Sequence, residues 1–287
     1  MEKPSGIILI LLTTQRSVIK MFRQFYGMSC NPFEKGLKEK DAYISKDLKE
    51  MLARLDYLNE TRGIGLFTAA PGNGKTFALR CFAKKLNPNL TKVIYLCLST
   101  ITTVEFYRQL SVSLGLEPSF RKSDMFKNIK DYMEAMSNDK RVHYMLVWDE
   151  SQYLSNDILK DLKMLMNFSM DSKDCFSLAL IGQPILNNNL EKQIHEALKQ
   201  RVIVNYDFEG LSEDEAKEYI RSRLTLAGAS SAIIDSNAIQ AAYASCGGSI
   251  RRLNMLLIKA LIVGAQHEKP SIDIDIIMAA ANDLSLR

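Results

Sequence analysis

The chain has 287 residues, of which 47% are hydrophobic and 24% charged, so a globular protein with a buried core is expected. Its formal net charge of +4 permits contact with nucleic acid without arguing for it. The five cysteines and three histidines are widely scattered, which favours free thiols in a reducing compartment over a disulfide framework or a zinc site.

The N-terminus contains a short apolar run at residues 7–12, preceded by Lys3. The run is far below the roughly 20 residues that span a bilayer. A weak signal peptide is one interpretation. We favour a disordered leader over residues 1–20, with the natural start near Met21. No other segment has the length and apolarity of a membrane span. The scattered free thiols favour a cytoplasmic protein, and no membrane contact is expected.

Strands and helices are predicted to alternate through the first two thirds of the chain. The predicted helices, in chain order, are 46–59, 76–86, 103–114, 123–136, 155–168 and 190–200. The predicted strands are 65–69, 93–98, 144–148, 177–181 and 202–206. Each strand is apolar throughout, which indicates a parallel sheet covered by helices on both faces. The fold class is therefore α/β.

Only helices are predicted after Gly210. Ser212 and Glu215 form a capping box that opens the first of them, which ends at Gly228. Further helices are expected at 236–244, 250–265 and 273–284. A small all-helical domain is therefore expected to follow the α/β domain.

The strongest motif is Ala69-Ala70-Pro71-Gly72-Asn73-Gly74-Lys75-Thr76, which matches the P-loop pattern G-x-x-x-x-G-K-[ST] except at its first position. Its two glycines allow the backbone amides to turn inward around phosphate, and the following helix adds its positive end. Lys75 is expected to reach the β- and γ-phosphates of ATP, and the Thr76 hydroxyl to bind Mg²⁺. We expect nucleotide contacts from this loop and the first turn of its helix: Ala70, Pro71, Gly72, Asn73, Gly74, Lys75, Thr76 and Phe77.

Two adjacent acids follow the strand predicted at 144–148, as in a Walker B motif. Asp149 is expected to hold Mg²⁺, and Glu150 to act as the general base towards the attacking water. Two solvated acids at the end of a strand are the alternative.

Three further polar side chains are candidates for contact with the γ-phosphate. Gln183 follows the strand at 177–181 and is expected to orient water, although it also fits an ordinary turn with Pro184. Arg201 precedes the last strand and is expected to act in trans on a neighbouring subunit's nucleotide; a surface arginine is the alternative. Arg251 or Arg252 is expected to contact phosphate from the helical domain.

Together these motifs resemble the AAA+ ATPases of the ExeA, TnsC and TniB group and, more distantly, MuB and IstB. The resemblance runs from about Phe25 to the C-terminus. Residues 25–33 are similar to the family's opening, 43–59 to the segment that leads to its P-loop, and 69–76 and 149–152 to its Walker motifs. Residues 181–184 are similar to its sensor 1, 200–202 to its finger segment, 211–228 to its lid helix and 248–254 to its sensor 2 turn. It favours Arg252 over Arg251 as the sensor 2 residue. Ala69 and Ser151 depart from the family pattern, and both changes are expected to be tolerated.

The apolar run, the predicted elements and the resemblance together predict four parts of the chain. Residues 1–20 would be a leader, 21–60 an N-terminal segment packing on the ATPase core, 61–209 the AAA+ nucleotide-binding domain, and 210–287 the helical lid.

The first functional hypothesis is an ATPase that assembles into a ring or filament on double-stranded DNA, without sequence preference, and recruits a transposase, with a targeting adaptor as a further partner. Arg121, Lys122, Lys127 and Lys130 are candidates for phosphate contact, although a solvated helix face explains them equally well. The alternatives are an ATP-operated switch that recruits proteins without DNA, or an ExeA-like secretion ATPase. ExeA-like proteins carry a membrane span and a cell-wall-binding domain after the ATPase, whereas this sequence ends after the lid. A helicase or clamp-loader subunit is the remaining hypothesis.

Overall fold

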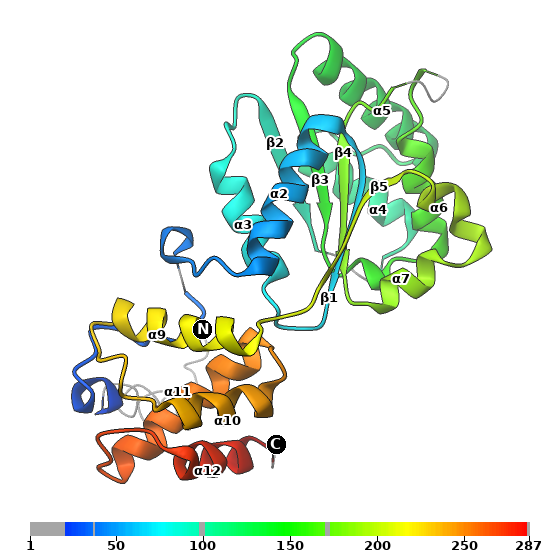
Figure 1. Cartoon of the computed structure of the whole chain (residues 1–287). Helices are drawn as coiled ribbons and strands as arrows, with labels where there is room; N and C mark the ends of the chain where they lie inside the picture. Colours follow the sequence, from blue (N-terminus) through cyan, green and yellow to red (C-terminus); the bar gives the residue numbers. More distant parts are fainter. Residues whose placement is uncertain (1–20, 37, 98–100, 170–172, 286–287) are drawn as a thin grey trace, which may run out of the picture. The chain divides into compact units, whose positions relative to one another are not determined.

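The computed structural model describes residues 21–36, 38–97, 101–169 and 173–285 (Figure 1). The expected leader at residues 1–20 lies outside these ranges. The described chain forms two compact units. One is Lys46–Glu209, and the other combines the described residues up to Ser45 with those from Gly210 onward.

The unit Lys46–Glu209 is built on a five-stranded sheet in the order β2-β3-β4-β1-β5. Its strands are β1 (Gly63–Ala69), β2 (Thr91–Leu96), β3 (His143–Trp148), β4 (Ser177–Gly182) and β5 (Val202–Phe208). Every strand pairing is parallel. Strands β1, β3 and β4 are buried at every residue, whereas the edge strands β2 and β5 are partly exposed. The predicted α/β class with a parallel sheet is confirmed.

Helices connect the strands and cover the sheet. They are α2 (Lys46–Thr61), α3 (Lys75–Lys85), α4 (Thr103–Ser113), α5 (Lys122–Asn138), α6 (Asn156–Leu165), α7 (Ile185–Leu190) and α8 (Glu196–Lys199), with 3-10 turns at η2 (Ser151–Tyr153) and η4 (Gln193–His195). In Figure 1, α2 and α3 lie in front of the sheet and α4 lies behind it. The single helix expected at 190–200 is instead divided among α7, η4 and α8. Lys192 has an extended backbone, which interrupts helical hydrogen bonding between α7 and η4.

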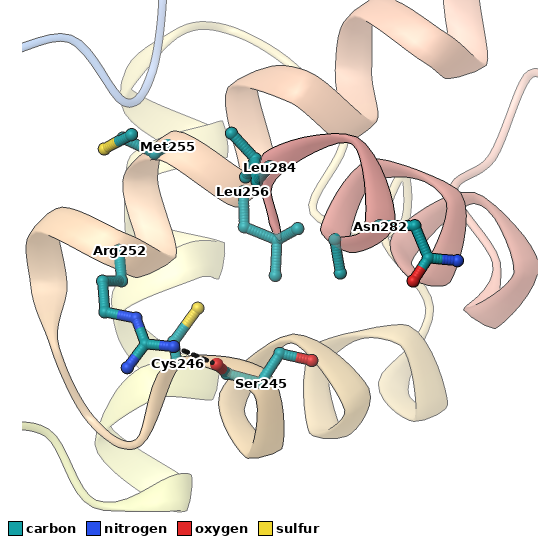
Figure 2. A pocket seen from close by; sticks show the side chains of 8 residues that line it. Ser245, Cys246, Arg252, Met255, Leu256, Asn282 and Leu284 are labelled. Atoms are coloured by element: carbon teal, nitrogen blue, oxygen red, sulfur yellow. Dashed lines mark hydrogen bonds between the residues drawn. The ribbon is translucent and has the colours of Figure 1, made fainter. Parts of the chain in front are cut away.

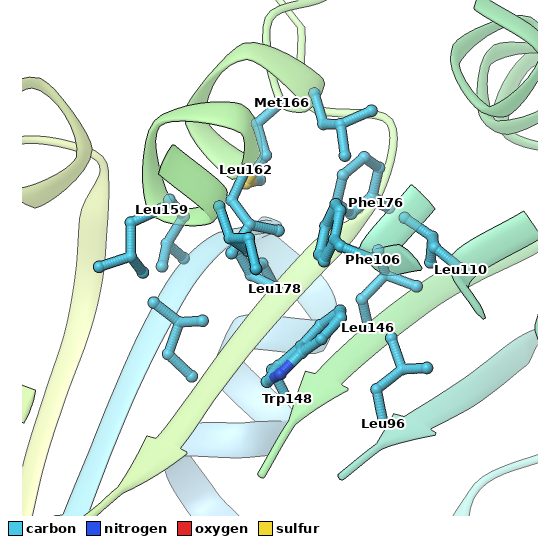
Figure 3. Packing of buried hydrophobic residues seen from close by; sticks show 14 of the residues in the cluster. Leu96, Phe106, Leu110, Leu146, Trp148, Leu159, Leu162, Met166, Phe176 and Leu178 are labelled. Carbon is cyan, nitrogen blue, oxygen red and sulfur yellow. The ribbon is translucent and has the colours of Figure 1, made fainter. Parts of the chain in front are cut away.

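The apolar core of this unit surrounds Trp148, the last residue of β3 (Figure 3). Its indole is fully buried and stacks on Phe106 of α4, with ring centroids 4.8 Å apart. Leu162 of α6 and Leu178 of β4 belong to the same core. Because Trp148 is packed on all sides, the end of β3 and the two acids that follow it have a fixed position.

The second unit contains α9 (Glu213–Leu226), α10 (Ser236–Cys246), α11 (Ile250–Gln266) and α12 (Ile274–Ser285). The predicted capping box is present, since the Ser212 hydroxyl accepts from the Glu215 amide and the Glu215 carboxylate accepts from the Ser212 amide. A close backbone approach joins α9 to α11. A Cβ atom on Gly248 would lie 2.6 Å from the carbonyl oxygen of Leu211, so only glycine fits there.

The N-terminal segment is divided between the two units, which corrects the expected 21–60 segment. Phe22 and Phe33 are buried in the core of the helical unit. The Tyr26 hydroxyl donates to the Lys269 carbonyl at 3.0 Å, and Arg223 Nε donates to the Pro32 carbonyl at 2.6 Å. Residues 46–61, in contrast, form α2 of the α/β unit. Aromatic side chains far from the C-terminus in sequence thus complete the core of the helical unit.

Within the described residues, no helix combines the length and the apolar character that a bilayer crossing requires. The apolar run at residues 7–12 lies outside that part of the chain.

Candidate functional site

The P-loop joins β1 to α3 at the carboxyl edge of the sheet. Ala69 is the last residue of β1 and is 1% exposed, so the position that departs from the glycine pattern packs within the sheet. Gly72 and Gly74 have φ values of 91° and 94°. Side chains other than glycine rarely adopt that conformation, which explains both glycines. Gly74 also caps the N-terminus of α3.

The loop contains one cation, the Lys75 ammonium group. The Lys75 ammonium group donates to the carbonyls of Ala69 at 2.7 Å and Ala70 at 3.4 Å, which holds it inside the loop. A buried cation and the positive end of α3 match the chemistry of a phosphate chain. The loop therefore fits the nucleotide predicted from its sequence.

Thr76 and Asp149 lie together, as the predicted magnesium site requires. The Thr76 hydroxyl donates to Asp149 Oδ2 at 3.0 Å. The hydroxyl of Tyr95, in β2, donates to the same oxygen at 2.7 Å. Burial and the bond to Asp149 raise the pKa of Tyr95, so the phenol stays protonated and remains a donor at neutral pH. Asp149 is only 4% exposed, and this pair of oxygen ligands suits Mg²⁺.

Glu150 follows Asp149 in a left-handed backbone conformation, with a φ of 56°. This conformation is uncommon outside glycine and is found where surrounding contacts enforce it. The Glu150 amide donates to Asp149 Oδ1 at 2.9 Å. The Ser151 hydroxyl donates to the Trp148 carbonyl at 2.7 Å, so the serine that departs from the family pattern closes the same turn. The carboxylate of Glu150 accepts from Gln152 Nε2 at 2.6 Å.

Gln183 directly follows β4, which lies between β1 and β3 in the sheet. Its backbone amide donates to Gln152 Oε1 at 3.0 Å. The ends of β1, β3 and β4 thus bring Lys75, Thr76, Asp149, Glu150 and Gln183 to one edge of the sheet, as the parallel order requires.

Arg201 lies at the opposite end of the strands from the P-loop, just before β5 begins. Val202, the next residue, pairs with Ile64 near the start of β1, whereas Phe208 pairs with Ala69 at its end. Five residues of β1 separate these two ends of the sheet, or roughly 17 Å at about 3.3 Å per residue. Burial lowers the pKa of Arg201 from its ordinary value, although the guanidinium remains a cation. Within one chain, Arg201 is therefore remote from the P-loop.

Arg252 belongs to the helical unit, on the first turn of α11. Its guanidinium donates to the Ser245 carbonyl at 2.9 Å, beside a cavity of about 390 Å³ between α10, α11 and α12 (Figure 2). The cavity wall is otherwise mainly apolar, with Met255, Leu256 and Leu284. Arg252 itself is exposed, as is its neighbour Arg251.

Sequence reasoning missed Tyr95 and Gln152. Tyr95 stands in an edge strand with no motif around it, so nothing in the sequence indicated its contact with Asp149. Gln152 was visible as the fourth residue of the Asp149 segment, but no role could be assigned before its contacts were known.

A cluster of three polar side chains, Thr68, Asp207 and Asn187, also lies at the carboxyl end of the strands. Asn187 Nδ2 donates to Asp207 Oδ1 at 2.9 Å and to Thr68 Oγ1 at 3.1 Å. The Thr68 hydroxyl donates to Asp207 Oδ1.

Comparisons with known proteins agree with this geometry. Residues 58–190 match the family model of the AAA domain. General secretion pathway protein A of Aeromonas hydrophila is 31% identical over 245 residues, which cover 84% of this chain and 44% of that protein. The chain therefore spans less than half the length of this relative.

Solved structures share the fold at low sequence identity. Cdc6p of Pyrobaculum aerophilum has a TM-score of 0.65 at 15% identity, covering 88% of this chain and 70% of that chain. A chain of the Drosophila ORC structure has a TM-score of 0.69 at 13% identity, covering 93% and 66%. The RuvB branch migration motor of Thermotoga maritima has a TM-score of 0.57 at 16% identity, covering 85% and 70%. The P-loop geometry, the sheet order and these matches together identify residues 58–190 as an AAA domain built on the P-loop NTPase fold.

Proposed function

We propose that the chain binds ATP with Mg²⁺, hydrolyses it to ADP and phosphate, and uses the cycle as a switch that acts on protein partners. The observation that carries the proposal is the contact between Thr76 and Asp149, because it joins the phosphate loop to the acidic end of β3. Glu150 follows Asp149 directly, and its amide donates to Asp149 Oδ1, so the expected general base lies beside the expected metal ligand.

Each residue of the edge has a distinct role in this proposal. The backbone from Ala70 to Gly74 and the Lys75 ammonium hold the phosphates, and Phe77 lies in the first turn of the same helix. Thr76 and Asp149 hold the metal, which neutralises charge on the phosphates when bound. Glu150 accepts a proton from the attacking water at its carboxylate, and Gln183 helps to orient that water.

Arg201 supports a subunit-dependent reaction. Since Arg201 lies at the end of the sheet that is remote from its own P-loop, its charge would act on the phosphates bound by a neighbouring copy. We therefore include a homo-oligomer, ring or filament, in the proposal. Arg252 is proposed as a phosphate contact from the helical unit.

A protein-directed switch has more support than DNA-directed transposition. The relative at 31% identity is a secretion pathway protein, which favours a protein partner. Two of the four candidate DNA-binding cations also have partners inside the α/β unit. Lys122 lies 2.6 Å from Asp161, and Lys130 donates to the Asn167 carbonyl and lies above the Phe168 ring. Neutralised or engaged cations contribute less to phosphate binding.

A combined turnover and sedimentation experiment tests this proposal. ATP hydrolysis is measured first, and the purified chain is then sedimented with a non-hydrolysable ATP analogue, with and without duplex DNA at low salt. We expect Mg²⁺-dependent turnover and nucleotide-dependent assembly that is unchanged by DNA. Absence of turnover would contradict the ATPase proposal, and assembly that needs DNA as well as nucleotide would favour the transposition regulator.

A further inference from the structure

Gln152 contacts both the expected general base, Glu150, and the backbone of Gln183, which directly follows β4. It lies in the turn η2, two residues after Glu150, and is 8% exposed. Its side chain makes two hydrogen bonds in opposite directions: Nε2 donates to Glu150 Oε2 at 2.6 Å, and Oε1 accepts from the Gln183 amide at 3.0 Å. A single buried amide therefore connects the end of β3 to the end of β4.

The orientation of this amide follows from its partners. A backbone N–H only donates, so the atom that faces Gln183 must be the oxygen of Gln152. The NH₂ group then faces Glu150, whose carboxylate accepts. Both contacts depend on one orientation, and reversing the amide would oppose two donors on one side and two acceptors on the other.

Gly182 provides the space for this contact. A Cβ atom at position 182 would lie 2.7 Å from Gln152 Oε1 and 3.3 Å from the Gln152 backbone nitrogen. The first distance is shorter than real Cβ contacts, so a side chain at position 182 would displace the Gln152 amide. This observation is independent of the hydrogen bonds and indicates that the strand end is shaped around Gln152.

We propose that Gln152 is a positioning residue, which holds the Glu150 carboxylate in place for proton transfer and links its orientation to the position of Gln183. The inference rests on the proposed ATPase function. Glu150 has a left-handed backbone and a carboxylate at a partly exposed position, so its side chain needs a fixed partner to keep one rotamer. Gln152 supplies that partner without taking part in the reaction, because its amide neither gives up nor accepts a proton. A movement of the Gln183 backbone would be transmitted to Glu150 through the two bonds.

Three variants at position 152 test the role, with kcat, KM and the Kd of a non-hydrolysable ATP analogue measured for each. Gln152→Ala removes both bonds and is expected to lower kcat by about tenfold or more, with KM and Kd within about twofold. Gln152→Glu keeps an acceptor for the Gln183 amide but sets a second carboxylate against Glu150, and should lower kcat at least as much. Gln152→His is the conservative rescue, because a neutral imidazole has one donor and one acceptor nitrogen. It should retain more turnover than either.

A double-mutant cycle with Gly182→Ala separates positioning from general damage to the fold. Gly182→Ala should lower kcat in the native background by displacing the amide, and should add less than about twofold in the Gln152→Ala background. Thermal unfolding of each variant is measured in parallel.

Several results would overturn the inference. Native kcat in Gln152→Ala, a loss of turnover matched by loss of analogue binding, or equal effects of Gly182→Ala in both backgrounds would each do so. If the native protein binds and hydrolyses ATP while the variants are unaffected, only the positioning role fails. If the native protein shows no turnover, the proposed function fails and the inference with it.

Discussion

The Thr76 hydroxyl donates a 3.0 Å hydrogen bond to Asp149 Oδ2, which joins two residues that are 73 positions apart in the chain. Thr76 is the second residue of the helix α3, and Asp149 follows the buried strand β3. The two oxygen atoms that are expected to bind Mg²⁺ are thus already adjacent. Such preorganisation reduces the rearrangement that metal binding requires.

Replacing Lys75 should abolish tight nucleotide binding. Its ammonium is held inside the loop by the Ala69 and Ala70 carbonyls, so no other cation of this loop can substitute for it. We expect Lys75→Ala to raise the Kd for ATP by at least about tenfold in calorimetry, since charge-assisted bonds to phosphate are among the stronger ones. Lys84→Ala, an exposed lysine on the same helix, is the matched control. Native affinity in Lys75→Ala would refute the phosphate-binding assignment.

Glu150→Gln should separate binding from hydrolysis. The substituted amide keeps the size of the side chain and an oxygen that accepts from Gln152, but it cannot take a proton from water. We expect the Kd for ATP to stay within about twofold while turnover falls by about 10²-fold or more. Single-turnover phosphate release measures the effect. Turnover close to native would exclude Glu150 as the base.

The phenol of Tyr95 should support the metal site. Its bond of 2.7 Å to Asp149 Oδ2 orients the carboxylate beside Thr76. Loss of such an outer contact typically weakens metal binding by about 10- to 100-fold. We therefore expect Tyr95→Phe to raise the Mg²⁺ concentration for half-maximal turnover by about tenfold. Tyr153→Phe, at an exposed tyrosine in η2, is the control and should leave that concentration unchanged.

Arg201 should affect the rate of ATP hydrolysis only in the assembled homo-oligomer. In the proposed assembly its charge acts on the neighbour's nucleotide, where arginine in trans is worth about 10³-fold or more in turnover. We expect Arg201→Ala to retain nucleotide binding and self-association while losing the concentration-dependent part of hydrolysis. Lys199→Ala is the control, since that lysine is exposed and pairs with Glu191. Native turnover in an Arg201→Ala sample that still self-associates would disprove the assignment.

His143 should make the stability of the α/β unit depend on pH. Burial, with a smaller contribution from Arg62, lowers the pKa of His143 from 6.5 to about 4. Because the folded pKa is below the unfolded one, the unfolded chain binds the proton more readily. Stability is therefore fully present above about pH 6.5 and is lost as the pH falls towards 4, by up to about 3 kcal/mol.

Urea unfolding at pH 7 and pH 4.5 measures this loss. The ring Nε2 lies 3.0 Å from Ser177 Oγ, and glutamine retains a polar group for that contact. His143→Gln should therefore unfold with a smaller difference between the two pH values. An equal difference in the native and variant proteins would show that other groups carry the pH dependence.

The order of strands and helices could be predicted because each element has a local signal. Apolar runs predicted all five strands, and the Ser212 and Glu215 capping box predicted the start of α9. The helix predicted at 190–200 was wrong in its bounds, because periodicity alone does not reveal the extended residue Lys192. The expected segment 21–60 is divided between the two units, because local patterns do not say which core a buried aromatic side chain joins.

By itself, the sequence determined where the loop turns and where its cation lies. The expected roles of Gly72, Gly74, Lys75 and Thr76 depend on backbone conformation and charge within one turn, so their spacing alone was enough to predict them. Only the tertiary structure decided which distant groups complete the site. Tyr95 meets Asp149, and Gln152 links Glu150 to Gln183, because strand order in a parallel sheet makes neighbours of residues that local sequence does not relate.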